Sequence, residues 1–96
     1  MRLHSLPTRL GRKALIIEIP ISGQSLPLAI VTSHLESYPQ DIIYRRQQMD
    51  RIFDILKPYS NAIFTADFNF SKKNEGEYLP KDYIDSWHVC KIHLNT

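Results

Sequence analysis

The sequence predicts an α/β fold, more narrowly α+β, in which a β-hairpin, a helix and a third strand share one small core. Two strand-like segments at residues 14–21 and 28–35 come first and are joined by a turn. An amphipathic helix over residues 40–57 follows, and residues 62–66 form a third, short apolar strand. A chain of 96 residues is long enough to bury one core of this size and no more.

The first two strands are predicted from β-branched residues on both sides of a turn. Residues 14–21, ALIIEIPI, are rich in isoleucine, and Pro20 suits a strand end or a sheet edge. The sequence SGQS at residues 22–25 has the composition of a turn, and residues 28–35, LAIVTSHL, form the next strand. The pair predicts an antiparallel hairpin whose second strand turns polar only at its end.

Residues 40–57 have the spacing of an amphipathic helix that packs on a sheet. Asp41 places a negative charge in the first turn, where the helix dipole favours it. Asp41 and Arg45 are four residues apart, and Arg46 and Asp50 repeat this spacing, so the outer face is predicted to carry ion pairs. Apolar residues recur on one stripe of the helix: Ile42, Met49, Ile52, Phe53 and Leu56.

The composition describes an ordinary soluble globular chain and excludes several classes of protein. A net charge of +2 is too small to identify a nucleic-acid binder, and a single cysteine cannot form an internal disulfide. No apolar run approaches the roughly 20 residues of a transmembrane helix, and no apolar block of a signal peptide follows Arg2. We therefore expect a nuclear or cytoplasmic location and no membrane partner.

The positive charges leave two interpretations open. Short basic clusters most often form solvated surface, and the alternative is contact with phosphate groups. The chain has two such clusters: Arg2, Arg9, Arg12 and Lys13, and then Lys72–Lys73. Glycine-rich phosphate loops are excluded, because the three glycines lie far apart in the sequence.

Asp67 and Asn69 follow directly on the strand at residues 62–66. In an extended chain, residues two apart point to the same side, so the carboxylate and the amide are expected to face one pocket. A carboxylate can orient and deprotonate a water molecule, and an amide can donate to a phosphoryl oxygen. The alternative is a simple loop cap, because both residue types favour turns.

A second polar group ends the strand at residues 28–35. His34 can donate to a phosphate oxygen or to the Asp67 carboxylate, and Ser37 can act similarly. Glu36 suits either a metal ligand or an ion-pair partner for Arg45 or Arg46. A lone histidine after a strand is more often structural than catalytic, and that interpretation stays open.

The C-terminal segment offers weaker candidates. His88, Cys90 and His93 do not have the spacing of a structural zinc site, and Cys90 is interpreted as a small buried residue. Aromatic residues such as Tyr83 and Trp87 can stack on bases, but their spacing favours a place in the core.

Several motifs in series resemble the endonuclease/exonuclease/phosphatase superfamily. They are TSHLES at residues 32–37, Arg45 and Gln48 on the helix, IFTADFNF at residues 63–70, and Leu79-Pro80 followed by Asp85-Ser86-Trp87. The GRKAL segment at residues 11–15 also resembles the strand just upstream in that family. The likeness runs from Gly11 to Trp87 in order and spacing, and within the superfamily it is closest to the tyrosyl-DNA phosphodiesterases.

The resemblance implies a partial αββα sandwich with its site where the loops of two sheets meet. It also implies phosphodiester hydrolysis with Mg²⁺ or Mn²⁺, here by a DNA repair nuclease that releases a tyrosyl adduct from a DNA 5′ end. An RNA deadenylase, a sphingomyelinase and an inositol phosphatase remain open, because in-line attack on phosphate needs the same metal, oriented water and neutral donors.

The resemblance also assigns roles to four residues. Asp67 corresponds to the catalytic aspartate that activates water, and Asn69 to the amide that binds the scissile phosphate. His34 and Ser37 correspond to the strand-end residues that line the phosphate site, His34 as a catalytic residue and Ser37 as a substrate-binding one.

This chain also departs from the family pattern. Ala66 stands where the family has glycine. The family's early asparagine and its main metal-binding glutamate come from strands upstream of Gly11, and its C-terminal Asp-His pair lies beyond Thr96. We therefore expect residues 1–96 to be one partial domain, the central portion, without its principal metal ligand and without activity alone. The alternative is a degenerate, non-catalytic domain that binds phosphate or DNA weakly.

Overall fold

The computed structural model describes residues 1–69 and 79–85. Three features singled out in the sequence lie outside these residues. They are the Lys72–Lys73 cluster, Trp87, and the group His88, Cys90 and His93.

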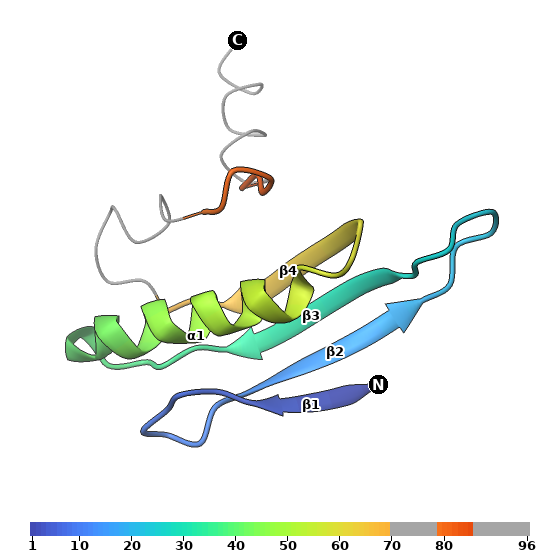
Figure 1. Cartoon of the computed structure of the whole chain (residues 1–96). Coiled ribbons are helices and arrows are strands. Elements are labelled where there is room, and N and C mark those ends of the chain that lie inside the picture. The colour runs from blue at the N-terminus through green and yellow to red at the C-terminus, as the bar shows by residue number, and fades with distance from the viewer. Residues whose placement is uncertain (70–78, 86–96) are drawn as a thin grey trace, which may run out of the picture.

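The described residues form a four-stranded sheet with one long helix against it (Figure 1). The strands are β1 (Arg2–Ser5), β2 (Lys13–Ile19), β3 (Leu28–His34) and β4 (Asn61–Asp67), and their order in the sheet is the order in the chain. Strands β1, β2 and β3 pair antiparallel, which confirms the predicted hairpin. Strand β4 pairs parallel with β3. The fold is therefore α+β, as predicted, with a mixed sheet.

Strand β1 is an element that the sequence did not reveal. Its four residues, RLHS, carry no run of β-branched side chains and were interpreted only as part of a basic cluster. The strand forms because it can pair with an existing edge, with Leu3 opposite Leu15 on β2. Long-range pairing of this kind leaves no periodic signal in so short a segment.

The parallel pairing of β3 and β4 decides where the polar strand ends lie. Parallel neighbours need a crossover between them, and the helix between β3 and β4 provides it. The two strands are in register along their whole length, so His34 is the direct partner of Asp67. Both strands therefore end at the same edge of the sheet.

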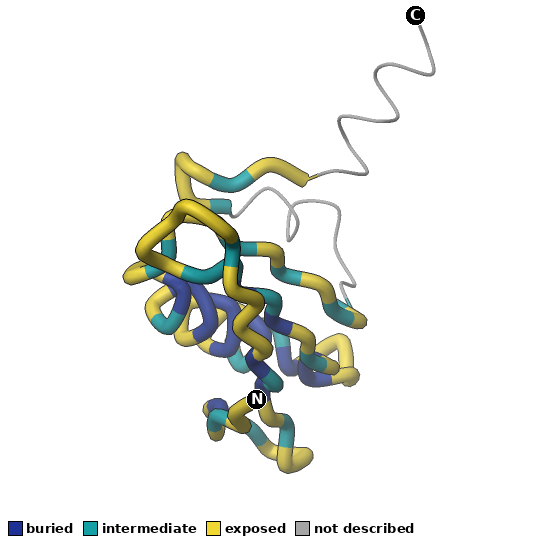
Figure 2. The backbone as a smooth tube through the Cα atoms, turned by 90° about the vertical axis from the view of Figure 1, so that its right-hand side faces the viewer, coloured by how far each residue is buried: buried dark blue, intermediate teal, exposed yellow. Residues whose placement is uncertain are grey.

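The helix carries the predicted apolar stripe. A short 3₁₀ turn, Pro39–Asp41, leads into α1 (Ile42–Leu56), close to the expected range of 40–57. Figure 2 shows buried positions where the helix and the sheet meet, and most of the stripe contributes to this core, whereas Ile42 is only half-buried. The core residues of helix and sheet are Ala14, Ile16, Ala29, Val31, Leu35, Met49, Ile52, Phe53 and Leu56, and Leu6 joins them from the loop after β1.

One expectation about the helix was wrong: Asp41 and Arg45 are not an ion pair on its outer face. Both are buried, Asp41 at 3% and Arg45 at 1% exposure. Arg45 donates to the backbone carbonyls of Tyr38 and Glu36. Asp41 accepts from Arg9 over 2.8 Å. Their charges stabilise the segment that leads into α1, because buried polar groups need such partners.

The sheet face away from the core is apolar and exposed. Strand residues alternate between faces, so Ile17 and Ile19 on β2 lie opposite the buried Ala14 and Ile16. On β4, Ile63 occupies this outer face and is 46% exposed. A sheet with one covered face and one bare apolar face is the arrangement of half a sandwich, in agreement with a partial αββα fold.

Candidate functional site

The ends of β3 and β4 bring His34 and Asp67 together. His34 Nε2 lies 3.5 Å from Asp67 Oδ2, as the sequence had suggested when it paired these two groups. Their side chains are 51% and 64% exposed, so both are open to solvent or to a ligand. A backbone hydrogen bond also joins the two strand ends, because the Leu35 N–H donates to the Asp67 carbonyl over 2.9 Å.

Asn69 lies at this edge because of a turn, whereas the sequence predicted that Asp67 and Asn69 share one extended segment. The strand ends at Asp67, and Asn69 has φ = 53° in the left-handed region, so the two residues are not in one extended run. The Asn69 N–H instead donates to Asp67 Oδ1 over 3.2 Å, and its Nδ2 donates to the Leu35 carbonyl over 2.9 Å. The carboxylate and amide are neighbours because of a turn.

Within the described part of the chain, Ser37 is linked to His34 through Arg12, which the sequence did not single out as part of the site. Arg12 Nη1 lies 3.3 Å from His34 Nδ1, and Arg12 Nη2 lies 3.4 Å from Ser37 Oγ. Arg12 had been grouped with the basic cluster at the N-terminus. The available signal was its place in the GRKAL segment, directly before β2. Arg12 adds a positive charge beside His34.

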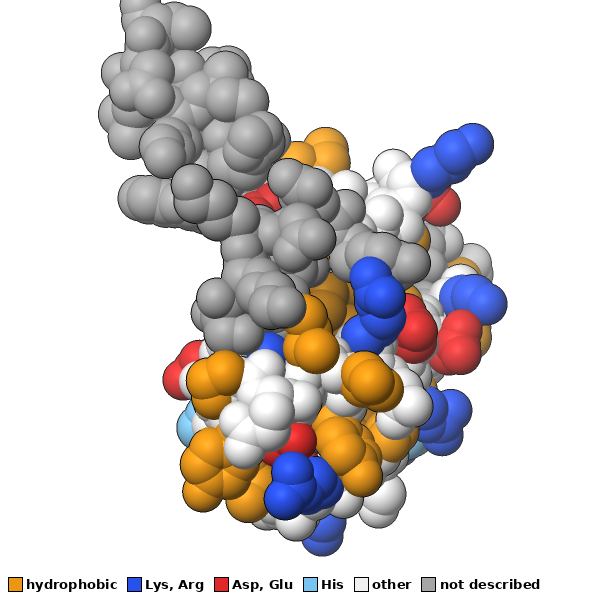
Figure 3. Space-filling model, turned by 90° about the vertical axis from the view of Figure 1, so that its left-hand side faces the viewer, with side chains coloured by type: hydrophobic (Ala, Val, Ile, Leu, Met, Phe, Trp, Pro, Cys, Tyr) orange, Lys and Arg blue, Asp and Glu red, His pale blue; other side chains and the backbone are white. Residues whose placement is uncertain are grey.

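Other members of the N-terminal basic cluster are paired within the fold. Arg2 lies 2.7 Å from Glu18 on the neighbouring strand, and Arg9 binds Asp41. Figure 3 looks at the end of the molecule where α1 begins and shows basic, acidic and hydrophobic side chains interspersed on that face. These two arginines therefore do not need a phosphate group as a partner.

Glu36 is fully buried, and its carboxylate is bound by the loop between β1 and β2. Thr8 Oγ1 donates to both of its oxygens, over 2.9 and 3.0 Å, and the backbone N–H groups of Arg9 and Leu10 donate to Oε1. Arg12 Nε lies 3.8 Å from Oε2. The carboxylate thus anchors this loop and is not turned toward Asp67 as a metal ligand.

The surroundings of Glu36 favour its charged form. Burial by itself raises the pKa of this carboxyl, but the hydrogen bonds from Arg9, Leu10 and Thr8 lower it by more. Its pKa in the folded chain therefore lies below the ordinary value of 4.5. A charge-assisted cluster of this kind contributes to stability as long as the carboxylate stays ionised.

Acid is expected to weaken the fold through Glu36. A carboxyl whose pKa is lowered by folding stabilises the folded state above its unfolded pKa, here about 4.5, and this contribution is lost as the pH falls through the folded pKa. Urea unfolding at neutral pH and at successively lower pH values measures the loss. The Glu36→Gln variant should be less stable at neutral pH and lose less on acidification. An equal pH dependence of both proteins would contradict this account.

The described residues do not form a complete metal site. Among residues 1–69 and 79–85, no three His, Cys, Asp or Glu side chains lie close enough together to hold a metal ion. Mg²⁺ is usually held by one or two carboxylates together with phosphate and water oxygens. Asp67 is the carboxylate at this edge, and its Oδ2 already faces His34. We therefore assign no step of a reaction to a metal.

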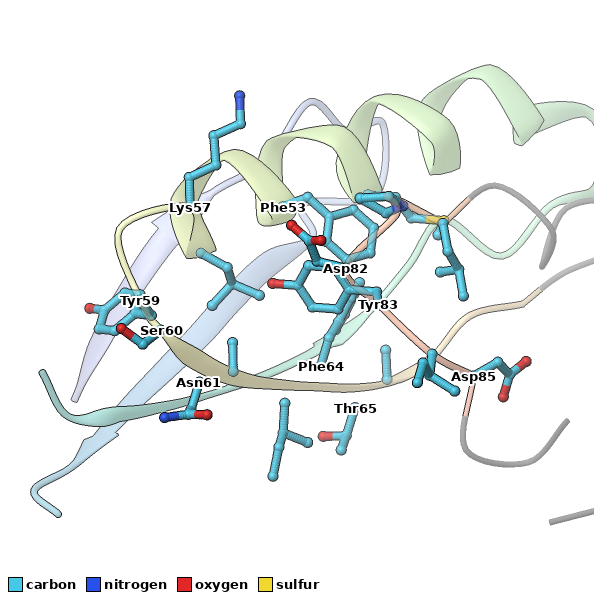
Figure 4. A pocket seen from close by; sticks show the side chains of 18 of the residues that line it. Phe53, Lys57, Tyr59, Ser60, Asn61, Phe64, Thr65, Asp82, Tyr83 and Asp85 are labelled. Atoms are coloured by element: carbon cyan, nitrogen blue, oxygen red, sulfur yellow. The ribbon is translucent and has the colours of Figure 1, made fainter. Parts of the chain in front are cut away.

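A groove of about 1290 Å³ lies elsewhere in the described part of the chain, between α1, β4 and residues 79–85. Figure 4 shows Phe53, Phe64 and Tyr83 directed toward one another in it, with ring centroids 4.6 Å apart for Phe53 and Tyr83. His34 and Asp67 are not among its lining residues. The groove extends the core and does not contain the polar edge.

Within the described residues, no helix is both long enough and apolar enough to span a membrane.

No protein-family model matches the chain, and no curated protein matches it either. Among solved structures, the chain is similar to humanized D. rerio TDP2 carrying 14 mutations, known from a crystal structure. The TM-score is 0.76 and the sequence identity 28%, over 93% of this chain and 38% of that one. The chain thus spans well under half the length of the protein that it resembles. The resemblance that the motifs predicted is therefore confirmed: in fold and in sequence the chain is similar to TDP2 of the endonuclease/exonuclease/phosphatase superfamily, as a partial domain.

Proposed function

We propose that this chain carries part of the site of a metal-dependent phosphodiesterase that acts on tyrosyl adducts at DNA 5′ ends. The observation that carries the proposal is the meeting of His34 and Asp67 at the ends of two parallel strands, with Asn69 bound at the same edge. The likeness to TDP2 supports a phosphodiesterase- or nuclease-like family. The narrower substrate follows from the name of that protein, tyrosyl-DNA phosphodiesterase 2.

Each side chain has a donor or acceptor available for the role proposed for it. The Asp67 carboxylate is 64% exposed and can orient a water molecule and accept its proton. Asn69 uses one amide hydrogen on the Leu35 carbonyl, and an amide has a second hydrogen to offer a phosphate oxygen. His34 is positioned to donate to the Asp67 carboxylate or to a phosphate oxygen. Ser37 is proposed to bind the substrate through its hydroxyl. That hydroxyl lies 3.4 Å from Arg12 Nη2, whereas the other terminal nitrogen of Arg12 contacts His34.

Dependence on Mg²⁺ or Mn²⁺ is a separate part of the proposal, and it comes from the resemblance alone. The described residues do not assemble a metal site. From the resemblance, and not from the structure, the principal ligand is proposed to come from outside residues 1–96. Such an ion stabilises charge on the transferring phosphoryl group. The residues of this chain would contribute the oriented water and the neutral donors.

A chimeric enzyme tests the proposal. In it, residues 1–96 replace the part of TDP2 that they match, and the release of tyrosine from a 5′-phosphotyrosyl oligonucleotide is measured with Mg²⁺. We expect the chimera to release tyrosine and the separate 96-residue chain to release none. A chimera that melts cooperatively and binds the oligonucleotide without any turnover would refute the proposed activity. Turnover by the separate chain that disappears in Asp67→Ala would refute the proposal that the chain is only part of a site.

A non-catalytic domain that binds phosphate or DNA remains the second candidate, and the exposure of His34 and Asp67 is the observation that favours it. It predicts oligonucleotide binding that weakens with salt and no turnover in the chimera. Measuring both oligonucleotide binding and tyrosine release by the chimera therefore distinguishes the two functions: the enzyme releases tyrosine, whereas the non-catalytic domain only binds.

A further inference from the structure

Arg12 is placed to control the chemistry of His34. Its guanidinium touches the imidazole at Nδ1, 3.3 Å away, on the side of the ring opposite Asp67. We propose that Arg12 is a positioning residue that fixes His34 in the tautomer with its hydrogen on Nε2, directed at the Asp67 carboxylate. This role goes beyond the residues assigned above.

The donor chemistry of the three groups leads to this tautomer. A guanidinium has only donors, so the ring nitrogen that it contacts must be the one with a lone pair. His34 Nδ1 is therefore the acceptor, and a neutral imidazole then carries its hydrogen on Nε2. Asp67 Oδ2 lies 3.5 Å from Nε2, and an ionised carboxylate only accepts. The His34 ring thus has a donor, Arg12 Nη1, beside Nδ1 and an acceptor, Asp67 Oδ2, 3.5 Å from Nε2.

The position of Arg12 is itself fixed by the buried Glu36 cluster. The Arg12 N–H donates to Thr8 Oγ1 over 3.0 Å, and the same hydroxyl donates to the fully buried Glu36 carboxylate. Arg12 Nε is also buried, 3.8 Å from Glu36 Oε2. Only 21% of the Arg12 side chain is exposed, so its guanidinium has little freedom to leave His34. The loop between β1 and β2 therefore connects a buried carboxylate to the exposed edge.

The proposed tautomer has a consequence for ligand binding that rests on the proposed function. With hydrogen on Nε2, His34 offers a donor at the edge where Asp67 and Asn69 lie. A phosphate oxygen bound there would replace the carboxylate as acceptor. With hydrogen on Nδ1 instead, the ring would present a lone pair to an anion, which is repulsive.

Nitrogen-15 NMR of the full 96-residue chain tests the tautomer without any substrate. Long-range proton–nitrogen spectra in mildly alkaline buffer distinguish protonated from unprotonated ring nitrogens, and His34→Gln assigns the signals. We expect the wild-type chain to show His34 protonated on Nε2. In Arg12→Met, the two nitrogen resonances should move toward each other as both tautomers become populated. Arg9→Met removes a guanidinium from the same loop, one that binds Asp41 and not His34, and should leave the signals unchanged.

Two results would overturn the proposal. One is a wild-type His34 with its hydrogen on Nδ1, and this result needs no variant, so it decides the matter even if Arg12→Met does not fold. The other is an unchanged Nε2-protonated ring in a folded Arg12→Met. Failure of the chimera to hydrolyse its substrate would contradict the proposed function and leave the NMR result standing, so the two outcomes are distinguishable.

Discussion

Replacing Asp67 by Asn in the TDP2 chimera is expected to lower the rate of tyrosine release about 100-fold or more, the usual contribution of a general base. The amide keeps the size of the carboxylate and can still accept from the Asn69 N–H, but it cannot take a proton from water. Steady-state release of tyrosine measures the effect. The loss should fall on kcat, because the side chain acts on the water rather than on DNA binding.

A matched control for Asp67 is Asp54 on the outer side of α1. Its carboxylate lies 3.0 Å from Lys57 Nζ and is 58% exposed, in the last turn of α1. Asp54→Asn removes the same charge and should leave the rate unchanged. An equal loss in both variants would show that net charge, and not a catalytic role of Asp67, sets the rate.

Replacing Glu36 by Ala is expected to lower the free energy of unfolding by about 3 kcal/mol or more, the scale of a buried ionic group that loses its partner. The substitution removes the acceptor that Thr8 Oγ1 and the Arg9 N–H share, and it takes the negative charge away from the mostly buried Arg12 guanidinium. Each unsatisfied donor is destabilising on its own. Urea unfolding at neutral pH measures the loss.

Asp54→Ala serves as the comparison for Glu36→Ala. Its ion pair with Lys57 is exposed on both sides, so the free energy of unfolding should fall by about 0.5 kcal/mol or less. If Glu36→Ala were as mild as Asp54→Ala, the carboxylate would not anchor the loop between β1 and β2. Arg12 would then not be held beside His34 by the Glu36 cluster.

The parts of the fold that depend on local pattern could be predicted from the sequence. The apolar stripe Met49, Ile52, Phe53 and Leu56 predicted both the helix and the face that it buries. The β-branched runs predicted β2, β3 and β4 to within about one residue at most ends. The same pattern predicted that His34 and Asp67 lie together, because buried strands that turn polar at their ends place both side chains at one sheet edge.

What could not be predicted depends on contacts between distant parts of the chain. From the sequence, Glu36 suited a metal ligand or an ion-pair partner for Arg45 or Arg46. Its carboxylate is instead bound by Thr8 and Leu10, 28 and 26 residues away. Arg45 has the spacing of a surface ion pair, yet its donors satisfy carbonyl groups in the segment before α1. Asn69 leaves the extended conformation, and its side chain donates to the Leu35 carbonyl just after β3. Spacing along the sequence contains none of this.

The proposed function requires that the ends of β3 and β4 form one phosphate-recognising edge around His34, Asp67 and Asn69. The most direct test is an NMR titration of the isotope-labelled chain with a 5′-phosphotyrosyl oligonucleotide. We predict that the largest backbone amide shifts occur at His34, Leu35, Asp67 and Asn69, and that they weaken in His34→Ala and Asp67→Asn. Shifts confined to the groove between α1 and β4, or shifts that both variants leave unchanged, would contradict the claim.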